Sequence, residues 1–416
     1  MALGRRALVV GGALAMAPLG WLYGCRRQVK GTLSLDPTRT LAVPPGFRVT
    51  ILERVGAPMS DGARVPALPD AMGAFAGEAG QVVLMRNHEA GRDMAMSGLD
   101  LNRLPEQMYD RGAAGGVTRL VVGPDLKRVT SHGVLAGTLR NCAGGVSPWG
   151  WLSCEESVEP GHGYVFLCPK GATRLTSPQR LTAYGRFNHE AACVDPATHI
   201  AYLTEDRPDG CLYRFVPRER ARPFEGVLQA LRVIGQPARN TGEGLAPGQR
   251  LAVDWVEAPE PEAEDDGLRL RSRARGACTI SRGEGLWFHD GRVYFAATSG
   301  GPNGTGQIFC LRDTRSGEAD LTLLAQSTSA DELDGPDNIT VAPWGDVIIA
   351  EDGRGEQYLR GLTRAGKLYN IARNALSEGE LAGVCFSPDG RTLFLNLQHD
   401  GLTVALSGPW RDLAPA

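Results

Sequence analysis

Six apolar, strand-like runs recur along the chain, and each ends in polar residues that can bind a metal ion or form hydrogen bonds. The runs span residues 81–89, 149–156, 199–207, 292–299, 346–352 and 392–399. Upstream of a run, a polar residue such as Glu190 or Glu284 precedes a turn signal, which indicates a hairpin. In an antiparallel hairpin the start of the first strand lies beside the end of the second, so both polar groups are expected at one rim. The pattern predicts an all-β fold, a six-bladed β-propeller with irregular insertions.

The spacing between the runs is uneven. Residues 90–140 and 216–278 separate neighbouring units widely and are expected to hold insertions. Helical periodicity is weak, and residues 222–234 and 368–379 are the best candidates for short helices. We therefore expect a single β-propeller domain over residues 51–416, preceded by a lead-in segment over residues 26–50.

The first 25 residues have the pattern of an export signal. Arg5-Arg6 precedes an apolar stretch from Ala7 to Leu22, and the pair resembles a twin-arginine signal. A general secretory signal and an uncleaved anchor are the alternatives. Residues 22–25 also resemble a bacterial lipobox, in which Cys25 would be lipidated. The twin-arginine export machinery is the expected partner, and the expected location is the periplasm or cell surface of a bacterium, with or without a lipid anchor.

Composition narrows the classes of function. The net charge of −3 gives no electrostatic reason to expect nucleic-acid binding. No apolar span of about 20 residues follows the N-terminus, so membrane contact is expected only through the signal or a lipid anchor. Nine cysteines, an odd number in a long chain, do not indicate a disulfide framework.

The expected rim is rich in carboxylates. The candidates are Glu89, Glu155, Glu156, Glu190, Glu205, Asp206, Glu284, Asp337, Glu351 and Asp352. Crowded carboxylates repel one another and raise one another's pKa values, and hard cations such as Ca²⁺ relieve that repulsion. Cys154 stands at a predicted strand end, where a thiolate among oxygens would suggest a transition metal such as iron. A rim of exposed acids without a metal is the alternative.

The hairpin geometry selects particular residues for this rim. It favours Glu155, Glu190, Asn338 and Glu351 as metal ligands. Arg282 stands two residues before Glu284, on the same strand face, and could clamp an anionic substrate, phosphate above all. The alternative for Arg282 is an ion pair with the acidic rim.

Several segments together resemble the PhoX-type alkaline phosphatases. The most specific runs from Leu139-Arg-Asn-Cys-Ala-Gly-Gly145 through Pro148-Trp149-Gly150 to Cys154-Glu155-Glu156. The other segments are residues 87–89, 187–190, 204–206, 282–284, 335–338 and 386–390. The resemblance extends from about Val43 to Gln398.

This resemblance implies an exported propeller phosphatase with a mixed cluster of Ca²⁺ and Fe³⁺. It implies that Cys154 is an iron ligand, that Glu205 and Glu284 bind the cluster, and that Arg282 contacts phosphate. Arg282, Glu284 and Cys154 are then the expected catalytic residues. The expected reaction is metal-dependent hydrolysis of a small-molecule phosphomonoester at one mouth of the channel. A calcium-dependent propeller hydrolase such as a lactonase, and a non-catalytic propeller that binds a metal or a partner, are the alternatives.

Overall fold

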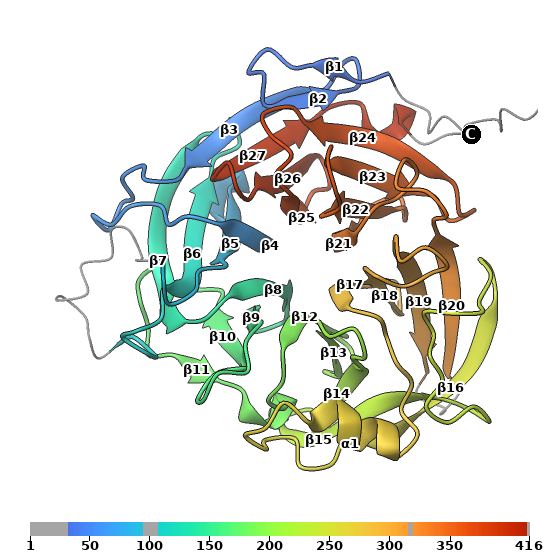
Figure 1. The fold of residues 1–416 in the computed structure, drawn as a ribbon. Helices are drawn as coiled ribbons and strands as arrows, with labels where there is room; N and C mark the ends of the chain where they lie inside the picture. Colours follow the sequence, from blue (N-terminus) through green and yellow to red (C-terminus); the bar gives the residue numbers. More distant parts are fainter. Residues whose placement is uncertain (1–31, 95–106, 315–318, 414–416) are drawn as a thin grey trace, which may run out of the picture.

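The computed structural model describes residues 32–94, 107–314 and 319–413, and their strands form six blades around a central channel (Figure 1). Blade 1 comprises β4 (Pro69–Ala76), β5 (Val82–His88), β6 (Gly115–Val122) and β7 (Arg128–Thr138). Blade 2 comprises β8 (Asn141–Val146), β9 (Gly150–Glu155), β10 (Val165–Pro169) and β11 (Gln179–Arg180). Blade 3 comprises β12 (His189–Val194), β13 (Ala201–Glu205), β14 (Leu212–Glu219) and β15 (Arg222–Val233).

The other three blades carry extra strands or borrow one. Blade 4 comprises β17 (Gly283–His289), β18 (Arg292–Ala297), β19 (Gln307–Asp313) and β20 (Ala319–Gln326). Strand β16 (Arg250–Glu257) pairs with both β15 and β20, so blades 3 and 4 share one sheet. Blade 5 comprises β21 (Pro336–Val341), β22 (Val347–Glu351), β23 (Tyr358–Leu362) and β24 (Leu368–Asn374). Blade 6 comprises β25 (Leu381–Phe386), β26 (Thr392–Leu397), β27 (Leu402–Ser407) and β3 (Arg48–Arg54). The predicted six-bladed propeller is confirmed.

Strand β3 closes the ring, because it comes from the N-terminal side of the chain and pairs with β27 from the C-terminal side. A buried ion pair adds to this closure: Glu53 of β3 accepts a 2.8 Å hydrogen bond from Arg86 of β5 in blade 1. Strands β1 (Ser34–Leu35) and β2 (Leu41–Val43) extend blade 5 along the edge of β24. The segment expected as a lead-in, residues 26–50, therefore supplies strands to the propeller. The expected signal, residues 1–25, lies outside the described residues.

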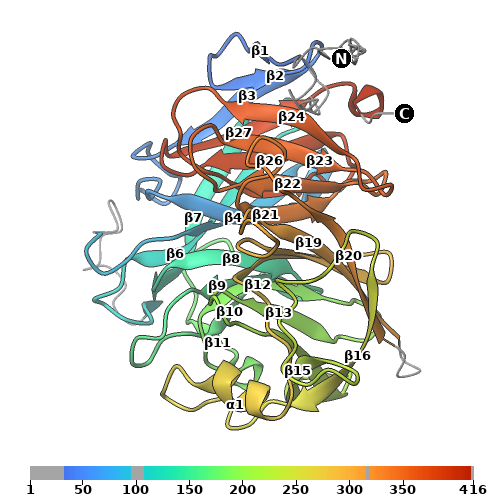
Figure 2. The same cartoon turned by 45° about the vertical axis from the view of Figure 1, so that its right-hand side comes forward.

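The two segments with weak helical periodicity are strands. Residues 222–234 contain β15 and residues 368–379 contain β24, each paired along its length with the preceding strand. Long-range backbone hydrogen bonds outweigh a weak local preference in such segments. The α-helix of the described residues is α1 (Leu268–Ala274), which lies at the opposite edge of the disc from β1 and β2 (Figure 2). Short 3-10 turns occur at Glu78–Gly80, Thr182–Tyr184 and Trp410–Asp412.

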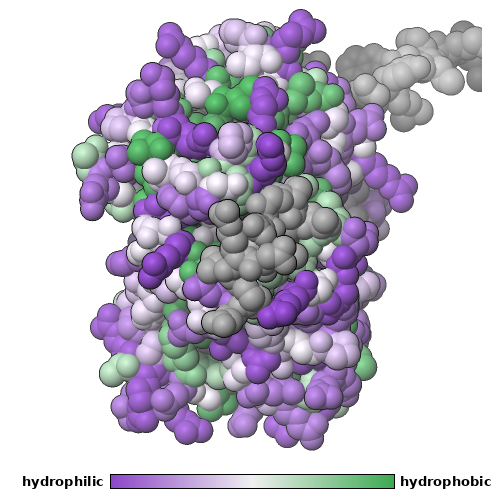
Figure 3. Space-filling model, turned by 90° about the vertical axis from the view of Figure 1, so that its left-hand side faces the viewer, coloured by the Kyte–Doolittle hydropathy of each residue, from purple (hydrophilic) through white to green (hydrophobic). Residues whose placement is uncertain are grey.

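The blades pack through apolar side chains and through very close backbone contacts near the channel. A β-carbon at Gly145 in β8 would collide with the carbonyl oxygen of Ala192 in β12, so this position admits only glycine. No disulfide joins the eight described cysteines. Polar residues dominate the outer face around blade 1 (Figure 3). Among the described residues, no helix has the length and apolar character needed to cross a membrane.

Candidate metal centre

The innermost strand of every blade is interrupted by a β-bulge near one mouth of the channel. In blade 2, Asn141 pairs with Glu155 and Gly144 with Ser153, which leaves two residues of β8 opposite one residue of β9. The same break occurs in β4, β12, β17, β21 and β25. The first residues of the six bulges are Asp70, Cys142, Glu190, Glu284, Asp337 and, in blade 6, Gly383. Because a bulge redirects a side chain, five blades present a metal-type ligand at one level of the channel.

A second set of side chains comes from the residue that follows the second strand of each blade. These residues are Glu89, Glu156, Asp206, Thr298, Asp352 and Gln398. Three of them, Glu89, Glu156 and Asp352, join the bulge residues and Glu380, which directly precedes β25, in four groups whose three ligand atoms lie within 4.8 Å of one another. The groups are Asp70–Glu89–Cys142, Cys142–Glu156–Glu190, Glu190–Glu284–Asp337 and Asp337–Asp352–Glu380. Neighbouring groups share a member, so the ligands form one continuous cluster across the mouth.

Burial and mutual repulsion disfavour the charged forms of these acids. Burial and Glu89 raise the pKa of Asp70, and burial and Glu284 raise the pKa of Glu190 well above the usual range. Burial and Asp352 raise the pKa of Asp337 to about 8. These shifts indicate that the protein's own cations do not compensate the negative charges of the ionised carboxylates. An uncompensated carboxylate is costly inside a protein.

Buried ligand atoms without partners test whether the cluster fits metal ions. Both carboxylate oxygens of Glu190 and Oδ1 of Asp70 are buried without a hydrogen-bond partner, although natural proteins rarely leave buried polar atoms unpaired. Oxygen ligands suit hard cations, and the Cys142 sulfur would suit a transition metal. Burial and the charge of Asp70 raise the pKa of Cys142, a shift that a bound cation would reverse. The donor set therefore fits a mixed metal cluster.

Arg282 lies at the same mouth and is held by two carboxylates. Its Nε and Nη2 atoms donate to Asp206 at 2.8 and 2.9 Å, and Nη2 also donates to Glu284 at 2.7 Å. The ion pair considered from the sequence is thus present. Among the described residues, no hydrogen bond engages Nη1, and 40% of the side chain is exposed. The fixed guanidinium therefore retains donors for an anion at the mouth.

The thiol expected at the site, Cys154, lies elsewhere. Cys154 is completely buried in a hydrophobic cluster with Leu152, Val165 and Tyr184. Burial raises its pKa, so it stays a neutral thiol. The structure instead brings Cys142 to the carboxylates. Assignment of the metal-binding thiolate to Cys154 was wrong because successive residues of a strand point to opposite sides, and Cys142 belongs to the innermost strand.

Glu155, Glu205 and Glu351 also differ from expectation. They are the last residues of the second strands, and each turns into its own blade to hold the following loop. Glu155 accepts hydrogen bonds from the backbone N–H groups of Leu139 and Gly163 and contacts His162 at 2.7 Å. Glu205 accepts hydrogen bonds from the backbone N–H of Cys211 and the hydroxyl of Tyr213. Glu351 accepts hydrogen bonds from Nε–H of Arg360 and from the backbone N–H groups of Asp334 and Tyr358. The next residue in two of these segments, Glu156 or Asp352, faces the cluster, so the expectation was displaced by one residue.

Glu190 and Glu284 lie in the cluster, as expected, and Asn338 lies beside it. The Asn338 side-chain oxygen accepts the backbone N–H of Gly383 at 2.9 Å, and its Nδ2 donates to Asp337. Asn338 therefore connects blades 5 and 6 and orients a ligand.

Asp70, Cys142 and Glu380 were missed as ligands. A sequence signal exists for two of them, because in blades 1 to 4 the ligand of the innermost strand is followed by a small residue. The pairs are Asp70-Ala71, Cys142-Ala143, Glu190-Ala191 and Glu284-Gly285. Glu380 lacks this signal because it precedes its strand.

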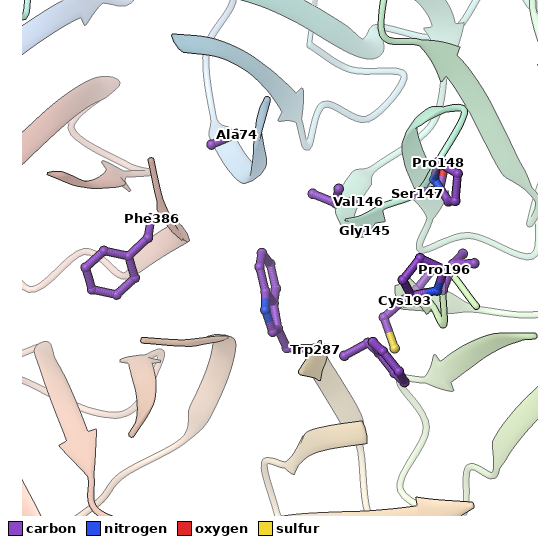
Figure 4. Close-up of a pocket in the computed structure, with 12 residues that line it drawn as sticks. Ala74, Gly145, Val146, Ser147, Pro148, Cys193, Pro196, Trp287 and Phe386 are labelled. Atoms are coloured by element: carbon purple, nitrogen blue, oxygen red, sulfur yellow. The ribbon is translucent and has the colours of Figure 1, made fainter. Parts of the chain in front are cut away.

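An apolar cavity of about 430 Å³ lies at the other end of the innermost strands (Figure 4). Ala74, Val146, Cys193, Trp287 and Phe386 contribute to its lining, and Trp287 stands near the middle of the view. Its lining contains no carboxylate or arginine. The cavity is therefore separate from the cluster.

A six-bladed propeller with acidic and thiol ligands gathered at one mouth has the features of a metal-dependent propeller enzyme. A family model described as alkaline phosphatase PhoX matches residues 30–132 and 123–401. The chain belongs to the PhoX alkaline phosphatase family, whose members are metal-dependent phosphomonoester hydrolases.

The solved structure of a family member has a related fold, and a lactonase structure is reported beside it. Pseudomonas fluorescens PhoX in complex with vanadate, a transition state analogue, has a TM-score of 0.67 at 18% identity, over 90% of this chain and 97% of that one. A gluconolactonase from Xanthomonas campestris has a TM-score of 0.45 at 14% identity, over 88% of this chain and 99% of that one. No curated protein sequence matches the chain.

Proposed function

We propose that this chain hydrolyses phosphomonoesters at the mouth where the bulge residues converge. The observation that supports this most directly is the gathering of Cys142 with buried, unpartnered carboxylates beside Arg282. The proposed ligands are Asp70, Cys142, Glu190, Glu284 and Asp337, with Glu89, Glu156, Asp352 and Glu380 around them. The proposed ions are Ca²⁺ for the oxygen-only groups and Fe³⁺ beside the thiolate. When bound, such ions polarise phosphoryl oxygens and offset their negative charge.

The residues of the chain then have separate roles. Arg282 would donate to the non-bridging phosphoryl oxygens, where charge accumulates as the phosphorus–oxygen bond breaks. Asp206 and Glu284 hold the guanidinium in place from two blades, so little ordering is needed when substrate binds. Pseudomonas fluorescens PhoX has been solved in complex with vanadate, a transition state analogue, and an oxyanion is the kind of ligand proposed here for Arg282.

We further propose that the chain is exported by the twin-arginine machinery to the periplasm or cell surface, where lipidation of Cys25 would anchor it. Support comes from Arg5-Arg6 and the apolar residues that follow. This pathway carries folded proteins, which suits an enzyme that must bind its metals before export.

Two cysteine variants test the proposed site. Cys142→Ala should lower kcat/KM for p-nitrophenyl phosphate by more than about a hundredfold, with loss of bound iron, because it removes the soft ligand. Cys154→Ala is the matched control: it should keep iron and activity and cost only about 1 kcal/mol of stability. Activity would be measured at alkaline pH with added calcium, and iron by mass spectrometry. Full iron content and activity in Cys142→Ala would refute the assignment.

A further inference from the structure

Arg140 occupies the same structural position in blade 2 that Arg282 occupies in blade 4. Each arginine stands two residues before the first residue of the bulge, Cys142 or Glu284. Each has a left-handed backbone conformation, with φ of 44° at Arg140 and 53° at Arg282. Such a conformation is uncommon for a residue with a long side chain.

The backbone hydrogen bonds of the two arginines also correspond. The N–H of Arg140 donates to the carbonyl of Ala90, two residues beyond the second strand of blade 1, at 3.1 Å. The N–H of Arg282 donates to Arg207, two residues beyond the second strand of blade 3, at 2.9 Å. Each arginine carbonyl accepts a 2.9 Å bond from the residue after the second strand of its own blade, Glu156 or Thr298. The propeller therefore brings both arginines to the same mouth, two blades apart.

The side chains of the two arginines differ in their contacts. The Arg282 side chain is held by Asp206 and Glu284, whereas the exposed Arg140 side chain makes no hydrogen bond or ion pair with another described residue. The carbonyl of Arg140 accepts the N–H of Glu156, so Arg140 stands directly beside a cluster ligand, and its charge lowers the pKa of that carboxyl against the effect of burial. Arg140 is thus an exposed cation at the rim of the site whose guanidinium is not paired with a described carboxylate.

We propose that Arg140 binds a second anionic group of the substrate and selects phosphomonoesters whose leaving group carries another phosphate or a carboxylate. This inference rests on the proposed function. The guanidinium of Arg282, held by two carboxylates, suits the invariant phosphoryl group, whereas the unpaired guanidinium of Arg140 remains available for a second anion. A guanidinium can bind phosphate or carboxylate through two parallel hydrogen bonds, which an ammonium cannot reproduce.

The test compares two sugar phosphates that differ by one phosphate. For Arg140→Gln, we expect kcat/KM for fructose 1,6-bisphosphate to fall roughly tenfold, with less than about a twofold change for fructose 6-phosphate. Arg140→Lys should recover part of the loss, and the loss should shrink at high salt because the contact is exposed. Arg391→Gln removes an exposed charge from the hairpin turn at the opposite face and should leave kcat/KM for both substrates unchanged.

Equal loss for both substrates would overturn the selectivity of Arg140 and leave the proposed phosphatase standing. If the wild type hydrolysed neither substrate, the proposed function would fail. The anion-binding role of Arg140 would then be tested separately, by calorimetric measurement of the affinities for methylenediphosphonate and methylphosphonate. A roughly tenfold weaker affinity of Arg140→Gln for the diphosphonate alone would support the second anion site. Equal affinities in wild type and variant would overturn it.

Discussion

Replacing Asp337 by asparagine should raise the free energy of unfolding of the metal-free protein and lower that of the metal-loaded protein. Asp337 is buried beside Asp352, and these two features raise its pKa from 3.8 to about 8. A carboxyl group whose pKa is raised by folding costs stability progressively as the pH rises from its unfolded pKa to its folded pKa. The metal-free wild type should therefore lose stability between about pH 4 and pH 8.

The size of the effect follows from the pKa shift. At pH 7 the penalty is about 4 kcal/mol, since each pH unit above 3.8 contributes about 1.4 kcal/mol. At pH 5 the same arithmetic leaves about 1.7 kcal/mol. Asparagine has nearly the same size and does not ionise, so Asp337→Asn removes this penalty. With metals bound, the carboxylate is compensated, and the variant should lose metal affinity instead.

Urea unfolding of chelator-treated protein at pH 5 and pH 7 measures this difference directly. Metal-free Asp337→Asn should exceed the wild type in stability, and the gain should be larger at pH 7. In metal-loaded protein the order should reverse. Equal stability of the metal-free proteins at pH 7, or a gain that does not change with pH, would refute the electrostatic reasoning.

Two further predictions concern buried charges away from the cluster. Burial opposes the charged form of His162, but hydrogen bonds to Glu155 and Asp110 outweigh it and raise its pKa above 6.5. The stabilisation from protonated His162 is complete below pH 6.5 and disappears as pH rises through the raised pKa. In urea titrations, the stability of metal-loaded wild type relative to His162→Asn should therefore decline from pH 6 to pH 9. A difference in stability that widens with pH would contradict this. Arg86→Met should lower the free energy of unfolding by about 3–5 kcal/mol in the same assay, because it leaves Glu53 buried with only the partly exposed Arg128 as a cation. A decrease below about 1 kcal/mol would show that this ion pair contributes little to ring closure.

The blades were predictable because hairpins are local. Apolar alternation and turn residues recur within each unit. An error in the predicted register of one hairpin would therefore not change the predicted number of hairpins. Arg282, Glu190 and Glu284 were predictable for the same reason, since they stand at the starts of strands whose direction the turns define. The thiol was placed wrongly because Cys142 and Cys154 both lie at strand ends near the rim, and periodicity alone does not identify which strand lines the channel.

Local pattern thus accounts for the strands, the hairpins and the mouth at which polar residues gather. Blade order and the approach of Gly145 to Ala192 arise from packing between segments far apart in the chain, and the small residues that follow the bulge ligands do not by themselves reveal which strands line the channel. Those contacts determine that Asp70, Cys142 and Glu380 share a cluster while Glu155, Glu205 and Glu351 brace loops. A shift of one residue along a strand reverses the direction of a side chain, so the identity of a ligand depends on three-dimensional register.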